Sequence, residues 1–284
     1  MTDQGTSPAT TTATSTFGLV AGKRLLITGV LDTRSIAFTV ARIAMEQGAQ
    51  VVLTGFGKGK RLTQRAARQL PGDVEILDLD ITDEQDLANV AKHLQEKWGA
   101  LDGVLHAVGF APSSCLGGGF MDAPWEDVAT AMQVSTYSLV SLARAMRPLL
   151  AKGTNASIVG LDFDATIAWP GYDWMGVAKA GLESACRYAA RDLGPDGIRV
   201  NLVAAGPIHT MAARSIDGFD GFEGVWDDRA PLGWDTRDCE PVARTTVSLF
   251  SDWTPGITGE IIHVDGGVHA IGAGMPAEAA TPQD

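Results

Sequence analysis

Residues 24–54, RLLITGVLDTRSIAFTVARIAMEQGAQVVLT, decide the fold. The stretch begins with the apolar run Arg24–Thr28, continues with apolar residues at helical spacing over Ser35–Gln47, and ends with a second apolar run, Gln50–Thr54. Short apolar runs predict buried strands, and Gly48 ends the helix between them. A strand, a helix and a strand within about 30 residues form a βαβ unit, which predicts two parallel strands in one sheet.

The same alternation continues along the chain. Further strands are predicted at Glu75–Leu79, Leu101–Ala107, Ala156–Leu161, Arg199–Val203 and Glu260–Val264. Predicted helices are a basic segment ending near Leu70, then Asp83–Trp98, about Trp125–Leu149, about Tyr172–Leu193 and about Glu240–Phe250. Apolar strands separated by crossover helices are typical of a parallel sheet covered on both faces. The predicted fold is α/β, a single Rossmann-type doubly wound parallel sheet of about seven strands with helices on both faces.

The two ends of the chain differ from the region between them. Residues 1–17 are rich in threonine and offer little apolar surface to bury, so we expect a disordered tail. Residues 273–284 have neither helical nor strand periodicity, and we expect a flexible C-terminal tail. Because no linker rich in Pro, Gly or Ser divides residues 18–272, these residues are predicted to form one domain.

Composition excludes several classes of protein. The 284 residues include 22 Lys and Arg against 34 Asp and Glu, a net charge of −12 at pH 7. This charge repels nucleic-acid phosphates and anionic membranes, so we expect neither as a partner. No run reaches the roughly 18 apolar residues of a membrane span, and the N-terminus lacks a signal-peptide pattern. The 3 cysteines and 5 histidines have no ligand spacing, which predicts no metal site and fits a cytoplasmic protein.

The turn after the first strand has properties of a phosphate-binding site. Gly29 ends the strand, and the small residues Ser35 and Ala37 flank Ile36 where the next helix begins. A helix N-terminus attracts anions through its free N–H groups and its dipole. The turn is not Gly-x-Gly-x-x-Gly, however, and a glycine here is also ordinary turn chemistry. A pyrophosphate site and a simple turn both remain open at this stage.

The segments after the second and third strands bear on the nucleotide. NAD-binding proteins often have an acidic residue about 20 residues past the glycine turn, but the sequence here is Gly55-Phe56-Gly57-Lys58. Phe56 is expected to lie against an adenine. The nearby cations either meet a 2′-phosphate or are solvated in a surface turn; they are Lys58, Lys60 and Arg61. Asp80, followed by Ile81, either binds the adenine amino group or forms a turn or helix cap.

The pair Tyr172 and Lys179 is the strongest functional signal. Seven residues are almost two helical turns, so both side chains project from one face of the predicted helix, roughly 10 Å apart along its axis. Such a pair can bracket a sugar and a substrate. An ammonium close to the phenol is expected to lower the pKa of the phenol by favouring the phenolate, and it can donate to ribose hydroxyls.

Together these motifs resemble those of NADH-dependent enoyl-acyl carrier protein reductases of the short-chain dehydrogenase/reductase superfamily, most closely the actinobacterial and mycobacterial type. The resemblance extends from Gly22 to about Ile271. Its most specific element is Tyr-x6-Lys, since commoner members of the superfamily have Tyr-x3-Lys and position 176 here is Gly176. The other matching stretches are residues 29–37, 53–56, 79–80, 108–110, 162–164, 204–210, 226–231 and 263–267.

The resemblance implies hydride transfer from NADH to the β-carbon of a trans-2-enoyl thioester in fatty acid elongation, the thioester being carried by acyl carrier protein or coenzyme A. Tyr172 then stabilises charge on the thioester oxygen, Lys179 holds the nicotinamide ribose, and Phe163 is a third catalytic-site residue that steers the acyl chain. The remaining implied cofactor contacts are Val108, Gly109, Ile208 and Thr210, and the implied substrate contacts are Phe110, Met175 and Met211. The family precedent is a homotetramer.

Two features depart from the family pattern. The segment Met211–Val225 is shorter than the lid of the mycobacterial relatives, which predicts a preference for shorter acyl chains, and Gly117-Gly118-Gly119 predicts a flexible loop. Two alternative functions remain. An NADPH-linked 3-oxoacyl reductase would need a lysine four residues after the tyrosine and a serine where Asp162-Phe163 stands. A catalytically silent dinucleotide-binding regulator would have no use for the phenol.

Overall fold

The computed structural model describes residues 18–211, 213 and 220–274, so the predicted tail 1–17 and most of 273–284 lie outside the described residues. Its strands are β1 (Arg24–Ile27), β2 (Gln50–Gly55), β3 (Glu75–Asp78), β4 (Gly103–His106), β5 (Ser157–Asp162), β6 (Arg199–Ala205) and β7 (Ile261–Val264). The described helices are α1 (Ile36–Glu46), α2 (Gly59–Ala67), α3 (Glu84–Lys97), α4 (Trp125–Met132), α5 (Ser138–Leu150), α6 (Asp173–Leu193), α7 (Asp220–Arg229) and α8 (Glu240–Phe250). Of these elements, the sequence pattern did not predict α7.

All seven strands form one parallel sheet in the order β3-β2-β1-β4-β5-β6-β7. Ile27 of β1 lies opposite Leu53 of β2 on one side and Leu105 of β4 on the other. The chain first builds outward from β1 to β3 and then returns to β4, so the direction of winding reverses between β1 and β4. This order confirms the predicted doubly wound sheet of seven strands.

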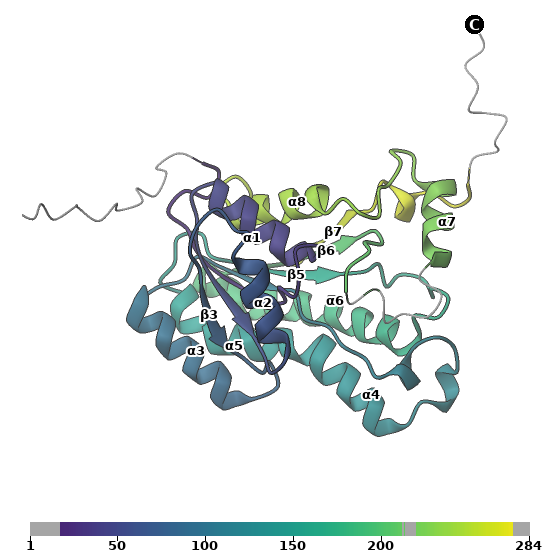
Figure 1. Cartoon of the computed structure of the whole chain (residues 1–284), viewed down its shortest axis with the longest axis horizontal. Helices are drawn as coiled ribbons and strands as arrows, with labels where there is room; N and C mark the ends of the chain where they lie inside the picture. Colours follow the sequence, from purple (N-terminus) through teal and green to yellow (C-terminus); the bar gives the residue numbers. More distant parts are fainter. Residues whose placement is uncertain (1–17, 212, 214–219, 275–284) are drawn as a thin grey trace, which may run out of the picture.

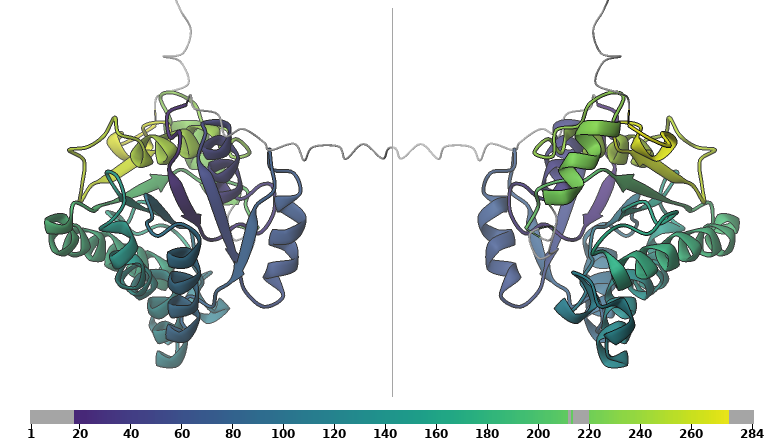
Figure 2. Two further views of the ribbon diagram at one scale, coloured as in Figure 1. Left: turned by 90° about the vertical axis from the view of Figure 1, so that its left-hand side faces the viewer. Right: turned by 90° about the vertical axis from the view of Figure 1, so that its right-hand side faces the viewer.

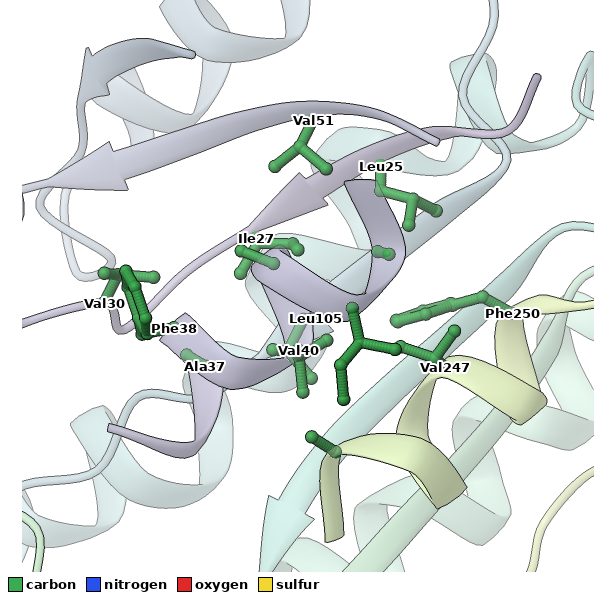
Figure 3. Packing of buried hydrophobic residues seen from close by; sticks show 14 of the residues in the cluster. Leu25, Ile27, Val30, Ala37, Phe38, Val40, Val51, Leu105, Val247 and Phe250 are labelled. Atoms are coloured by element: carbon green, nitrogen blue, oxygen red, sulfur yellow. The ribbon is translucent and has the colours of Figure 1, made fainter. Parts of the chain in front are cut away.

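Helices cover both faces of the sheet (Figure 1). Leu25 and Ile27 belong to a core shared with α1 and α8, whereas Leu26 between them belongs to a second core shared with α3, α5 and α6. This alternation follows from the period of two along a strand. Figure 2 shows the two layers from the side, with purple α1 and yellow-green α8 above the sheet and teal α5 and α6 below it. In Figure 3, Phe250 of α8 lies close to Leu25 in the first core.

The long helix predicted over residues 125–149 contains one irregular turn. A π-helical segment, Gln133–Tyr137, separates α4 from α5. Within this segment Ser135 is buried, and its hydroxyl accepts a hydrogen bond from Phe110 N and donates one to Phe110 O, both at 2.9 Å. A π turn inserts a residue into the helix and is frequent at functional sites. The insertion lets the helix hold the loop that follows β4.

Leu105 offers a direct test of this packing. It is buried in β4 between β1 and β5, so Leu105→Ala should lower the free energy of unfolding by about 2–5 kcal/mol, measured by urea denaturation. Leu232, which is 89% exposed, is the matched control, and Leu232→Ala should change the free energy of unfolding by less than about 0.5 kcal/mol. Equal losses in the two variants would contradict the placement of β4.

Candidate active site

The loops after β1 and β4 come into contact at the carboxyl edge of the sheet. The Thr28 hydroxyl donates to Leu105 O at 2.8 Å and accepts from Ala107 N at 3.1 Å. Gly29 has φ +80°, and a Cβ atom at this position would lie 2.0 Å from Ala107 O. Only glycine therefore permits this approach. Ligands of doubly wound sheets bind where the strand order reverses, which is the place where these two loops meet.

The N-terminus of α1 lies beside this contact. Ser35 is its N-cap; the hydroxyl donates to Asp32 O at 2.7 Å and accepts from Phe38 N at 3.4 Å. The N–H groups of Ile36 and Ala37 belong to the first turn and have no acceptor within the helix. Ala37 is buried, and its methyl side chain adds little bulk beside these N–H groups. This arrangement would fit a pyrophosphate, which is one of the two interpretations that the sequence left open for this turn.

The residues expected at the adenine end lie farther along the same edge. Phe56 follows β2 and is 58% exposed, so its ring face is available for stacking. Lys60 forms an ion pair with Asp78 at 2.5 Å, which leaves it committed to a carboxylate. The Oδ1 atom of Asp80 accepts from the N–H and the hydroxyl of Thr82, so Asp80 does form a turn, while its predicted contact with an adenine stays a prediction. The Ile81 side chain is buried in the core below α3.

Tyr172 and Lys179 are both buried, at 8% and 9% exposure. Tyr172 stands at the N-terminal boundary of α6, and Lys179 follows within the helix. The Lys179 Nζ atom donates to Leu161 O at 2.8 Å and lies 3.8 Å from Oδ1 of Asp162. Within the described part of the chain, the Tyr172 hydroxyl forms no hydrogen bond. The phenol is therefore a buried hydrogen-bond donor without an acceptor among the described residues.

The electrostatics of the pair correct one expectation. Burial raises the pKa of Tyr172 above its ordinary value, and the charge of Asp162 raises the pKa further. The expectation that Lys179 lowers the pKa of the phenol is wrong, because both groups of effects that act on Tyr172, burial and the charge of Asp162, raise its pKa. Burial also lowers the pKa of Lys179, while Asp162 opposes that change. The phenol accordingly stays protonated and can act as a hydrogen-bond donor.

A buried histidine lies close to this pair. His106 ends β4, and its Nε2 atom is 2.7 Å from the Ser138 hydroxyl. Burial, followed by the positive charge of Lys179, lowers the pKa of His106 to about 3. His106 is therefore neutral near pH 7, and Lys179 supplies the positive charge of this buried region.

A cluster of aromatic rings centred on Phe163 packs against the phenol ring. The ring of Phe163 lies 5.1 Å from that of Tyr172, 5.4 Å from that of Trp169 and 5.9 Å from that of Trp226. Trp169 and Trp226 are themselves 5.1 Å apart, and Met175 belongs to the same buried cluster. Phe163 and Met175 thus belong to the same cluster as Tyr172, and their predicted roles toward a substrate stay predictions. Sequence reasoning assigned no role to Trp169 or Trp226, which extend the aromatic cluster around Phe163.

The remaining predicted residues follow β4 and β6. Val108, Gly109 and Phe110 come after β4; Phe110 is 53% exposed, and a Cβ atom on Gly109 would have only the Ser135 hydroxyl nearby, at 3.8 Å. Ile208 is buried after β6, and the Thr210 hydroxyl accepts from Ala213 N at 3.1 Å. Met211 is half-buried, and residues 212 and 214–219 of the segment Met211–Val225 lie outside the described residues.

The three consecutive glycines support the start of α6. Gly117, Gly118 and Gly119 all have positive φ angles. Gly117 N donates to Gly171 O at 2.9 Å, and Gly118 N donates to Oδ2 of Asp173 at 2.7 Å. Asp173 itself has φ +41°, a left-handed conformation that Asp tolerates better than most residues. The loop expected only to be flexible is hydrogen-bonded on both sides of Tyr172.

A doubly wound parallel sheet with a glycine turn at its reversal point and a buried Tyr/Lys pair beside it defines a dinucleotide-binding reductase of the short-chain dehydrogenase/reductase class. Comparison of the sequence with known protein families identifies the family within this class. Residues 29–269 match the family described as Enoyl-(Acyl carrier protein) reductase. The chain belongs to that family.

Individual relatives agree with this assignment. The enoyl-[acyl-carrier-protein] reductase [NADH] of Mycolicibacterium smegmatis is 46% identical over 264 residues, covering 88% of this chain and 97% of the relative. The enzyme of the same name from Mycobacterium avium is 44% identical over 263 residues, with the same coverage. The relative from Aquifex aeolicus is 40% identical over 258 residues, 90% of this chain and 94% of its own length. None of the described helices is both long and apolar enough to cross a membrane.

The protonated phenol gives a spectroscopic prediction. The Tyr172→Phe variant should leave unchanged the phenolate absorbance that the folded protein develops as the pH rises, because burial holds the pKa of Tyr172 above that range. A reduced signal in Tyr172→Phe would show that the phenol ionises in the folded protein.

Proposed function

We propose that this chain is an NADH-dependent trans-2-enoyl-acyl carrier protein reductase of fatty acid elongation. The observation that carries the proposal is the buried Tyr172 phenol, which is protonated, has no hydrogen-bond partner among the described residues and precedes Lys179 by two helical turns. Membership of the enoyl-(acyl carrier protein) reductase family supports it, as do the printed names of the relatives, which specify NADH.

The residues at the reversal point of the sheet fit the dinucleotide. Gly29 and the first turn of α1, with Ser35, Ile36 and Ala37, would hold the pyrophosphate through backbone N–H groups. When bound, NADH supplies the hydride that reduces the β-carbon of the enoyl thioester. Lys179 would hold the nicotinamide ribose, since its ammonium has further N–H donors besides the one used by Leu161 O. The remaining proposed cofactor contacts are Phe56, Asp80, Ile81, Val108, Gly109, Ile208 and Thr210.

The protein groups around the thioester stabilise charge and exclude water. Tyr172 would donate its hydroxyl proton in a hydrogen bond to the thioester oxygen, where negative charge develops as the β-carbon is reduced. A preoriented donor in a desolvated site is worth far more than the same donor in water. The α-carbon then takes a proton from solvent or through Tyr172. Phe163 packs against the phenol ring and fixes its position, and the other proposed substrate contacts are Phe110, Met175 and Met211.

Three finer features belong to the same proposal. The thioester carrier is acyl carrier protein, with coenzyme A as the alternative, because the names of the relatives specify the protein-bound substrate. The assembly is a homotetramer, following the family precedent. The location is the cytoplasm, which fits the distant and buried cysteines.

A spectrophotometric assay of NADH oxidation distinguishes the proposed activity from its rivals. Turnover of 2-enoyl thioesters but not of 3-oxo thioesters is expected. Oxidation of NADH with a 3-oxo substrate alone would favour the 3-oxoacyl reductase, and binding of NADH without turnover of either substrate would favour the regulator. A preference for NADPH would show that Lys58 and Arg61 bind a 2′-phosphate despite the commitment of Lys60 to Asp78.

Replacement of the phenol tests its role directly. Tyr172→Phe should lower kcat with an enoyl thioester by about 100- to 1,000-fold, the usual effect of removing one donor to a developing oxyanion. The dissociation constant for NADH should change little, because the phenol is assigned to the substrate. Tyr188→Phe, on the exposed surface of the same helix, should retain the parent kcat. Full activity in Tyr172→Phe would contradict the proposed role of the phenol.

A further inference from the structure

Asp162 is a buried carboxylate whose oxygens lack hydrogen-bond donors. It is the last residue of β5, directly before Phe163, and its side chain is 0% exposed. By distance and angle, neither Oδ1 nor Oδ2 accepts a hydrogen bond from any residue that the structure describes, and the groups that favour its charged form are the Lys179 ammonium and the Phe163 N–H. Buried polar atoms are almost always paired, because leaving them unpaired costs the free energy of their lost hydration. A nearby positive charge is the usual way to offset the cost of burying such a carboxylate.

Lys179 supplies that explanation. Its Nζ atom lies 3.8 Å from Oδ1 of Asp162, too far for a good hydrogen bond but close enough for strong attraction in a region that excludes water. The ammonium is held in this place by Leu161 O, the acceptor from the residue just before Asp162. Helix α6 and strand β5 therefore hold the ammonium and the carboxylate close together without a direct hydrogen bond between them. The ammonium keeps donors free for a ligand while the carboxylate offsets its charge.

We propose that Asp162 is a positioning residue for the dinucleotide: it is the counter-ion that keeps the Lys179 ammonium charged and available to the nicotinamide ribose. This inference rests on the proposed function, since it takes the ribose as the partner of Lys179. It assigns to Asp162 a role exerted only through Lys179, and none in contact with the substrate.

The surrounding groups are consistent with this role. Burial lowers the pKa of Lys179, and Asp162 counteracts that change. Burial raises the pKa of Asp162 to about 7, and Lys179 opposes that rise. Asp162 is therefore increasingly ionised above neutral pH, which is where Lys179 needs a counter-ion to remain protonated. The other titratable groups that interact with this pair are His106, Asp164, Tyr172, Glu183 and Cys186.

The test is the pH dependence of the NADH dissociation constant, measured by nucleotide fluorescence without substrate. Asp162→Asn is nearly isosteric and removes the negative charge without breaking a hydrogen bond among the described residues. Lys179 should then lose its proton at lower pH. Affinity for NADH should fall at a pH about one to three units lower than in the parent protein. Below pH 7 the two proteins should converge, because Asp162 itself becomes protonated there.

Asp164→Asn is the matched control. Asp164 is also buried, but its Oδ1 atom accepts from the N–H and the hydroxyl of Thr166. Because the charge of Asp164 is the smallest of the effects on the pKa of Asp162, this control should move the pH profile much less than Asp162→Asn does. Asp162→Ala provides a second removal of the charge and should reproduce the shift of Asp162→Asn, with circular dichroism confirming that each variant is folded.

Each outcome decides the inference. An Asp162→Asn profile that coincides with the parent profile, or affinity reduced equally at every pH, overturns it, because a purely structural role has no pH signature. A parent protein that does not bind NADH overturns it together with the proposed function. If the parent binds NADH but reduces no enoyl thioester, and the shifted profile is observed, the proposed function fails while the role of Asp162 stands.

Discussion

The parallel pairing of β1 with β4 is the constraint on which the rest of the structure depends. At their carboxyl ends Thr28 joins the two strands through its hydroxyl, and Gly29 lets the two following loops approach more closely than any side chain would allow. Because the strand order reverses here, α1 begins on one side of this contact, and the elements bearing the Tyr/Lys pair lie on the other. A sheet without this reversal would separate the helix N-terminus from the phenol.

Desolvation determines the protonation states of the groups around the Tyr/Lys pair. Tyr172, Lys179 and Asp162 are all nearly inaccessible to water, so each interaction among them is stronger than on the surface. The same burial that keeps the phenol protonated tends to discharge the ammonium. A neutral donor and a charged donor can coexist here only if the ammonium receives an offsetting charge, and Asp162 is placed to supply it. The aromatic rings around Phe163 maintain the low dielectric on which this division depends.

The sequence predicted the architecture better than the electrostatics. Periodicity located every strand and the helix with Tyr172 and Lys179, because burial on both faces leaves a strong apolar signal. The π turn at Ser135 left no such signal, since inserting one residue barely alters the apolar pattern of a long helix. Spacing along α6 predicted the alignment of the pair but not its burial, which arises from residues distant in sequence such as Trp226. The predicted direction of the shift in the pKa of the phenol was therefore wrong.

An acidic protein that binds a polyanionic cofactor must attract it locally. The net charge of −12 is spread over the whole chain, and exposed charges are screened beyond roughly 8–10 Å at physiological ionic strength. The N–H groups at the start of α1 act within contact distance, where screening has little effect and the helix dipole adds to their attraction. At the adenine end, the pairing of Lys60 with Asp78 withdraws one cation from the surface that a 2′-phosphate would need. Short-range backbone donors, which we propose hold the pyrophosphate, would do so without creating a general affinity for anions, which accords with the unphosphorylated dinucleotide.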